Sequence, residues 1–162
     1  MDPIETSALV TASSIVPATP VLHLDSGCDM LGLRLTQLAL ETRIVCQDEA
    51  RVAELAAIFA GEGFPTIPIG TRTADLFPFP DETFMWAFAI IPPAQVGLLE
   101  DAAGEVARVM KTGGWIWVAR PVDSGDILLQ PHGFVPASQR TLVAGTSYAT
   151  RILRKVNADT PI

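Results

Sequence analysis

Short apolar runs alternate with stretches of helical periodicity along the chain from Pro20 onward. Apolar runs of about four to eight residues predict buried strands, and apolar positions that recur every three or four residues predict amphipathic helices. The predicted strands are 21–24, 43–47, 66–69, 84–91 and 115–119, and the predicted helices are 31–40, 48–61 and 95–111. Gly113-Gly114 is predicted to end the last helix.

Two further runs, 134–143 and 147–156, predict a closing hairpin that turns near Gly145. The proline-rich segment 76–83 is predicted to be a loop. Residues 1–19, rich in Ser, Thr, Ala and Pro, are predicted to form a tail or a lightly packed arm, and 157–162 a second tail. The chain between them, 20–156, is expected to be a single domain.

Repeated alternation of strand and helix is typical of a three-layer α/β/α sandwich with a mostly parallel sheet and right-handed crossovers. The terminal hairpin would add antiparallel strands at one edge of that sheet. In such sheets the ligand crevice lies beyond the carboxyl ends of the strands. We therefore look for functional residues directly after each predicted strand.

Composition narrows the classes of protein. Of 162 residues, 49% are hydrophobic and 18% charged, which excludes intrinsic disorder. Lys+Arg number 11 against Asp+Glu 18, a net charge of −7 that makes nucleic acid an unfavourable partner. We find no apolar run long enough to span a membrane and no signal peptide. Cys28 and Cys46 are expected to be buried free thiols in a cytoplasmic protein, although neighbouring strand ends could bring them together.

The second half of the chain contains two informative motifs, FPDETF (79–84) and EVARVMKTGGWIWVARP (105–121). FPDETF resembles the segment before the fourth strand of class I S-adenosylmethionine-dependent methyltransferases, and the longer motif resembles the helix, Gly-Gly turn and fifth strand of that family. The terminal hairpin resembles its last two strands, so the resemblance spans roughly 20–156. It implies a Rossmann-like sheet and S-adenosylmethionine as cofactor.

The cofactor loop of that family reads acid-x-Gly-x-Gly-x-Gly, and LDSGCDMLG (24–32) stands in its place. Asp25 matches the acid and Gly27 the first glycine, whereas Asp29 replaces the second glycine and Leu31 the third. The glycines let the backbone approach the methionine part of the cofactor. A carboxylate at Asp29 would add bulk and repulsion there, which predicts a degenerate cofactor pocket.

Two further cofactor contacts of the family have partial counterparts. The ribose-binding acid after the second strand falls on Asp48 when counted from Gly27, or on Cys46 when counted back from Gly63. Asp48 is equally well explained as a helix N-cap. Thr71 stands at the position of the acid that contacts adenine. The resemblance thus implies Asp25, Gly27, Asp29, Asp48 and Thr71 as cofactor-binding residues.

The catalytic positions are less well matched. Amino-group methyltransferases carry Asn or Asp, Pro-Pro and an aromatic residue after the fourth strand, where this chain has IPPA (91–94). Those aliphatic residues cannot orient an amine or stack on a base. His23 is expected to be an interior histidine, and no metal site is predicted. Trp86, Trp115 and Trp117 are expected in the core, with an exposed patch for self-association as the alternative.

These observations leave two hypotheses. The first is a methyltransferase-like protein with a degenerate cofactor pocket and a binding, scaffold or regulatory role, as a homodimer or with another protein. The second is an active S-adenosylmethionine-dependent small-molecule methyltransferase with a divergent glycine loop. The first is favoured because 122–133 offers few residues with which to cover a substrate.

Overall fold

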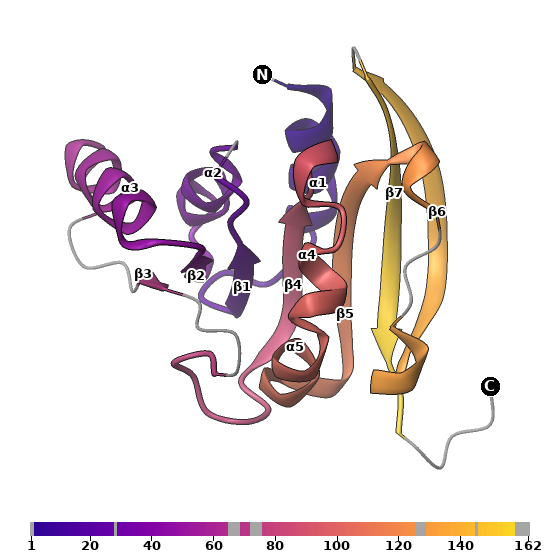
Figure 1. Ribbon diagram of the computed structural model, residues 1–162. Coiled ribbons are helices and arrows are strands. Elements are labelled where there is room, and N and C mark those ends of the chain that lie inside the picture. Colours follow the sequence, from indigo (N-terminus) through magenta and orange to yellow (C-terminus); the bar gives the residue numbers. More distant parts are fainter. Residues whose placement is uncertain are drawn as a thin grey trace.

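The computed structural model describes residues 2–27, 29–64, 69–71, 76–125, 129–144 and 146–157. Its strands form a seven-stranded sheet in the order β3-β2-β1-β4-β5-β7-β6 (Figure 1). They are β1 (Pro20–Leu24), β2 (Glu41–Cys46), β3 (Ile69–Thr71), β4 (Phe84–Ile90), β5 (Met110–Pro121), β6 (Phe134–Ala144) and β7 (Thr146–Lys155). Strands β1 to β5 pair in parallel, and β7 joins β5 and β6 in antiparallel pairs. This confirms the predicted mostly parallel sheet with a terminal hairpin.

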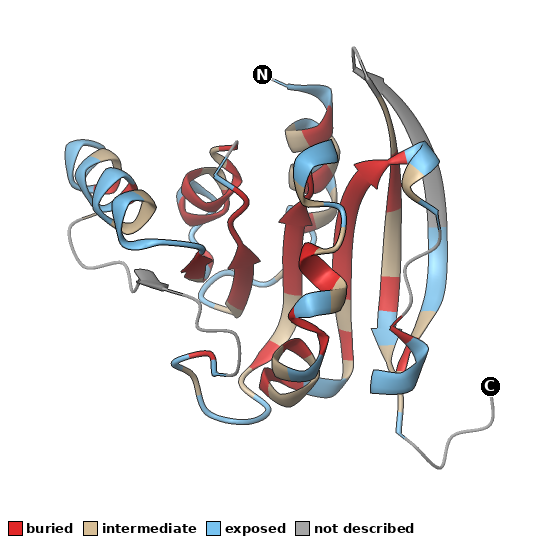
Figure 2. Cartoon of the chain, viewed as in Figure 1, coloured by how far each residue is buried: buried red, intermediate tan, exposed pale blue. Residues whose placement is uncertain are grey.

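The helices form two layers on the sheet. The first layer is α1 (Pro3–Ala12), α2 (Leu31–Gln37) and α3 (Glu49–Gly61), and the second is α4 (Leu98–Asp101) and α5 (Ala103–Val109). Short 3-10 turns η1 (Pro93–Gln95), η2 (Val122–Ser124) and η3 (Gln130–His132) connect other elements. Figure 2 shows the central strands buried between the layers. In the described ranges, no helix is long and apolar enough to cross a membrane.

The N-terminal segment differs from the predicted tail. Pro3–Ala12 is helical, and the Asp2 carboxylate caps it by accepting a hydrogen bond from the Ile4 N–H at 2.7 Å. Ile4, Ala8 and Ala12 lie on one face and are buried. The prediction of a tail or lightly packed arm is therefore wrong for α1, because two of its three buried positions are alanines, which give little hydrophobic signal.

The predicted helix over 95–111 is also wrong as a single element. The structure divides it into η1, α4 and α5, and Met110 already pairs with Phe84 as the first residue of β5. Gly113 adopts φ +84°, and a Cβ on Gly114 would lie 2.8 Å from the Lys111 carbonyl oxygen. The glycine pair thus shapes an irregular stretch within β5, beside the register shift opposite β4, and does not end a helix.

The strand boundaries otherwise follow the apolar runs. Strand β3 is Ile69–Thr71, later than predicted, while 65–68 and Gly145 lie outside the described residues. Trp117 is buried as expected. Trp86 and Trp115 are only half-buried and stack with ring centroids 6.0 Å apart. The core prediction therefore holds for one tryptophan, and the stacked pair lies nearer the surface of the sheet.

Candidate functional site

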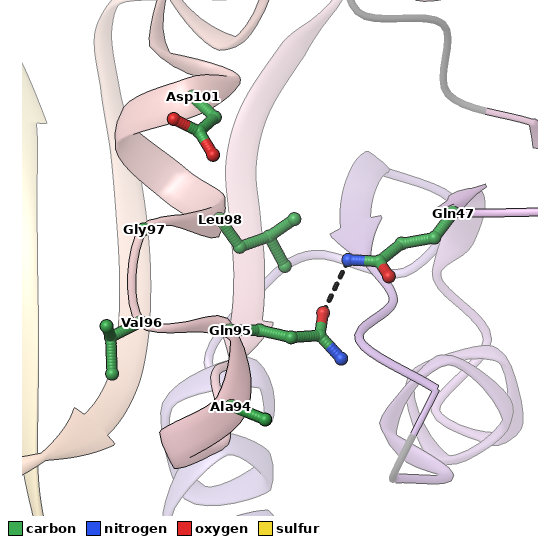
Figure 3. Close-up of a pocket in the computed structure, with 7 residues that line it drawn as sticks. All are labelled: Gln47, Ala94, Gln95, Val96, Gly97, Leu98 and Asp101. Atoms are coloured by element: carbon green, nitrogen blue, oxygen red, sulfur yellow. Dashed lines mark hydrogen bonds between the residues drawn. The ribbon is translucent and has the colours of Figure 1, made fainter.

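The carboxyl ends of β1, β2 and β4 meet at one edge of the sheet, because these strands are parallel neighbours. The loops that follow them bring together 25–30, 47–48 and 91–97. A pocket of about 540 Å³ lies at this edge, between Gln47 and the segment 94–101 (Figure 3). This is the place where open parallel sheets bind ligands.

Asp25 follows β1 and is 2% exposed. Its Oδ2 accepts hydrogen bonds from the Gly27 N–H at 3.0 Å and from Arg51 Nε at 2.9 Å, and its Oδ1 accepts from Arg51 Nη2 at 3.1 Å. Gly27 adopts φ +87°, a backbone conformation that residues other than glycine adopt only with strain. Asp25 therefore holds both the turn and the arginine.

Arg51 lies in the first turn of α3, and its guanidinium joins that helix to the loop after β1. Its Nη2 also donates to the Asp29 carbonyl oxygen at 2.8 Å, and its Nη1 lies 3.2 Å from Glu54 Oε2. Hydrogen bonding to Asp25 raises the pKa of Arg51 above its ordinary value. Every guanidinium nitrogen thus has an acceptor in the chain. Arg51 was not predicted from the sequence, although the Asp48 N-cap position places residue 51 in the first turn of the helix, which faces the β1 loop.

The Asp29 side chain is buried. Its Oδ1 accepts the Leu31 N–H at 2.9 Å and lies 3.3 Å from Nε2 of the fully buried His23. Burial lowers the pKa of His23, but the charges of Asp29 and Asp25 outweigh burial, so the pKa is raised. Burial acts to raise the pKa of Asp29, but His23 reverses this and lowers it. The carboxylate therefore pairs with an interior histidine, and the expected bulk of Asp29 in the crevice is not where the structure places it.

The N-terminal helix also contacts this loop. The Glu5 carboxylate of α1 accepts the Met30 N–H at 2.9 Å, just before α2 begins. This contact was not predicted from the sequence, because Glu5 was expected to lie in a tail. The loop between β1 and α2 is therefore held by two helices. Glu5 of α1 binds it at Met30, and Arg51 of α3 binds it at Asp25 and Asp29.

Two glutamines connect the loops around the pocket. Gln95 Nε2 donates to the Ser26 carbonyl oxygen at 2.7 Å, and Gln47 Nε2 donates to Gln95 Oε1 (Figure 3). Arg120, 4% exposed, holds the pocket wall by donating to the Val96 carbonyl oxygen at 3.1 Å and pairing with Glu100 at 2.6 Å. None of these residues was predicted, since amide and arginine positions in loops carry no periodic signal.

Comparison with solved structures identifies the architecture. A SAM-dependent methyltransferase from Aquifex aeolicus superposes with a TM-score of 0.71 at 13% identity, covering 94% of this chain and 90% of that one. A SAM-dependent methyltransferase from Methanosarcina mazei gives 0.71 at 12% identity, with coverage of 91% and 97%. The [4+2]-cyclase SpnF gives 0.73 at 17% identity, with coverage of 94% and 80%. No family model and no curated protein matches the sequence.

This chain has the class I S-adenosylmethionine-dependent methyltransferase fold. Identities this low establish the fold and leave the chemistry to the site.

Within the methyltransferase fold, the predicted ribose-binding position can be compared with the structure. Asp48 is the N-cap of α3, and its Oδ1 accepts the Arg51 N–H at 2.8 Å. Cys46 is the last residue of β2 and a buried free thiol, whose pKa burial raises to about 12. The N-cap interpretation of Asp48 is confirmed, and a ribose contact by either residue stays a prediction. Cys28 lies outside the described residues.

The remaining positions of the methyltransferase resemblance lie at the ends of β3 and β4, and a role for them stays a prediction. Thr71 ends β3, at the same edge of the sheet as the other loops. Pro92 and Pro93 follow β4, and the first polar side chain after them is Gln95.

His23, Asp25 and Asp29 place one ligand atom each within 4.8 Å of one another. Since Arg51 and His23 already pair with the two carboxylates, this cluster has its charges balanced without an ion.

Proposed function

We propose that this chain is a methyltransferase-fold binding protein whose own side chains take up the cofactor contacts, and that it acts by binding rather than by methyl transfer. The observation that carries the proposal is the bidentate pair between Arg51 and Asp25. Asp25 is the acid of the glycine loop, and in this pair both of its oxygens are engaged. The residues present therefore do not fit S-adenosylmethionine unless Arg51 moves away.

The energetics of the pair favour this closed arrangement. The side chains of Asp25 and Arg51 are 1% and 11% exposed, so opening the pair would leave a nearly buried carboxylate without its counter-ion. Breaking a buried ion pair by removing one partner typically costs about 3–5 kcal/mol. A ligand would have to offset that free energy before it gained any affinity of its own.

The segment that follows β4 supports the same proposal. The residues directly after β4 are Ile91, Pro92, Pro93 and Ala94, none of which has a side chain able to hold or transfer a proton. Gln95 is the nearest polar side chain, and its amide already spans from Ser26 to Gln47. An amide also neither accepts nor releases a proton at neutral pH.

Calorimetric titration with S-adenosylmethionine and with its demethylated product tests the proposal. We expect no binding by the natural protein up to about 1 mM ligand. Arg51→Gln frees Asp25 while keeping a side chain of similar length, and should bind at least about tenfold more tightly. Arg43→Gln, which removes a half-buried arginine paired with the exposed Glu41, is the matched control and should behave like the natural protein.

Micromolar binding by the natural protein would overturn the proposal and favour the active small-molecule methyltransferase. That second candidate has an observation of its own, because a Cβ at Gly27 would have no atom of the described residues beyond its chain neighbours within 4 Å. Circular dichroism of Arg51→Gln shows whether the variant is folded. If it does not fold, Asp25→Asn, which weakens the same pair while keeping an acceptor for Gly27, takes its place.

A further inference from the structure

The hydrogen bonds around the pocket have a fixed direction. The Ser26 carbonyl oxygen can only accept, so Gln95 presents its nitrogen there and its oxygen towards Gln47. Gln47 therefore presents its nitrogen to Gln95 and keeps its own Oε1 as a further acceptor. Figure 3 shows the two amides meeting across the pocket from opposite loops. The chain of amides ends in an oxygen that can receive a hydrogen bond from a ligand.

The charge of the pocket also favours a ligand that donates hydrogen bonds. We call it the amide pocket; it is lined by Gln47, Ala94, Gln95, Val96, Gly97, Leu98 and Asp101. Among these described residues only Asp101 is charged, and its carboxylate has no hydrogen bond or ion pair within the described part of the chain. Its neighbour Glu100 differs, because Arg120 pairs with it at 2.6 Å. The amide pocket thus offers an unpaired anion and no cation.

The shape of the pocket leaves that anion accessible. Gly97 has no side chain, and a Cβ there would lie 3.7 Å from Asp101 Oδ2. Leu98 is 7% exposed and extends between the two loops in Figure 3. The volume of about 540 Å³ is within the range of small-molecule sites, roughly 300–1,000 Å³. An apolar wall beside an unpaired carboxylate favours a ligand with a cationic donor at the end of a short aliphatic chain.

We propose that the amide pocket binds a small aliphatic amine, with the ammonium on the Asp101 carboxylate and the aliphatic chain against Leu98. This rests on the proposed function, since it names the ligand class of a protein that acts by binding. Each amide nitrogen keeps one N–H that could serve a neutral acceptor on the same ligand. Anions are disfavoured because they would meet Asp101 with no lining cation to offset it.

Three probes of equal length separate charge from size: n-butylamine, butan-1-ol and butyrate. Each is titrated to about 50 mM into the protein without S-adenosylmethionine, and the side-chain amide signals of Gln47 and Gln95 are followed by NMR. We expect the amine to bind about fivefold more tightly than the alcohol, the gain of one exposed charge pair, and butyrate to bind least. Equal binding of the three, tighter binding of butyrate, or no change with the amine would overturn the proposal.

Variants locate the effect. Asp101→Asn should reduce the affinity for the amine to that for the alcohol, and Asp123→Asn, which removes an exposed acid in η2, should leave it unchanged. Gly97→Ala should weaken amine and alcohol alike, because the methyl group narrows the pocket and leaves its charge unaltered. If Asp101→Asn has no effect, the amine binds elsewhere and the proposal fails.

The result is independent of the cofactor titration. Binding of both S-adenosylmethionine and the amine would overturn the proposed function and leave the amine site standing. Binding of neither would overturn the amine site and leave the closed cofactor loop standing.

Discussion

The two sides of the crevice differ in whether their polar groups are buried and paired. On the ion-paired side, which we define as His23, Asp25, Asp29 and Arg51, each charged group has a partner of opposite charge, and the histidine and both carboxylates are buried. On the amide side, formed by Gln47, Gln95 and Asp101, the groups are neutral or unpaired, and none of the three is buried. Both sides follow strands of the same sheet at the same edge.

The difference separates structural polarity from polarity that is available to a ligand. A buried charge must be paired, so the ion-paired side contributes to stability and has little left for binding. An exposed carboxylate and a free amide oxygen cost nothing to keep hydrated, and contribute to stability hardly at all. Substitutions on the two sides should therefore have opposite consequences, large for stability on one and small on the other.

Arg51→Met should have the largest effect. It leaves the Asp25 carboxylate almost fully buried without its counter-ion, and we expect the free energy of unfolding to fall by about 3–5 kcal/mol. Urea denaturation followed by circular dichroism measures the loss. Arg43→Met removes a half-buried arginine from its pair with the exposed Glu41 and should cost less than about 1 kcal/mol. Similar losses in both variants would mean that Asp25 is hydrated and the loop open.

The His23–Asp29 pair should make stability depend on pH. The pKa of His23 is raised in the folded state, so its contribution is complete below the unfolded value of 6.5 and is lost as the pH rises through the folded value. The pKa of Asp29 is lowered, so its contribution is complete above 3.8 and is lost in stronger acid. Besides Asp29, the charged groups near His23 are Asp25, whose charge raises the pKa of His23, and Arg51, whose charge lowers it.

The measurement is the melting temperature of the natural protein and of His23→Gln at intervals of pH. The difference between them should be largest between the two unfolded values, in mildly acidic buffer, and should shrink towards alkaline pH. A difference that grows as the pH rises would show that His23 is neutral in the folded protein.

Gly27→Ala should have a moderate effect. The left-handed φ of Gly27 costs an alanine about 1–2 kcal/mol, and no neighbouring atom adds to this because the space beside it is open. Gly61→Ala, in the last turn of α3 and also beside open space, is the matched control and should raise stability slightly. Thermal denaturation distinguishes them by sign, and a stabilised Gly27→Ala would mean that the turn has another conformation.

The sequence predicted the sheet well and the site poorly, for a physical reason. Strands such as β1 and β4 are buried on both faces, so an uninterrupted apolar run marks them directly. The site depends on how loops far apart in the sequence meet. Asp29 was expected in the crevice because it occupies a glycine position, but a buried histidine two residues before Asp25 draws it inward. Arg51 and Gln95 act over 26 and 69 residues, and no local pattern signals such contacts.

The smallest effect on stability is expected on the amide side, where Asp101→Asn and Gly97→Ala should each change the free energy of unfolding by less than about 0.5 kcal/mol. Asp101 has no partner to lose in the described part of the chain, and Gly97 adopts φ −84°, which alanine tolerates. Asp29→Asn supplies the contrast, since it removes a buried charge from beside His23 and should destabilise measurably in the same urea series. If Asp101→Asn proved as costly as Asp29→Asn, its carboxylate would hold the fold together, and the amide side would be structural like its neighbour.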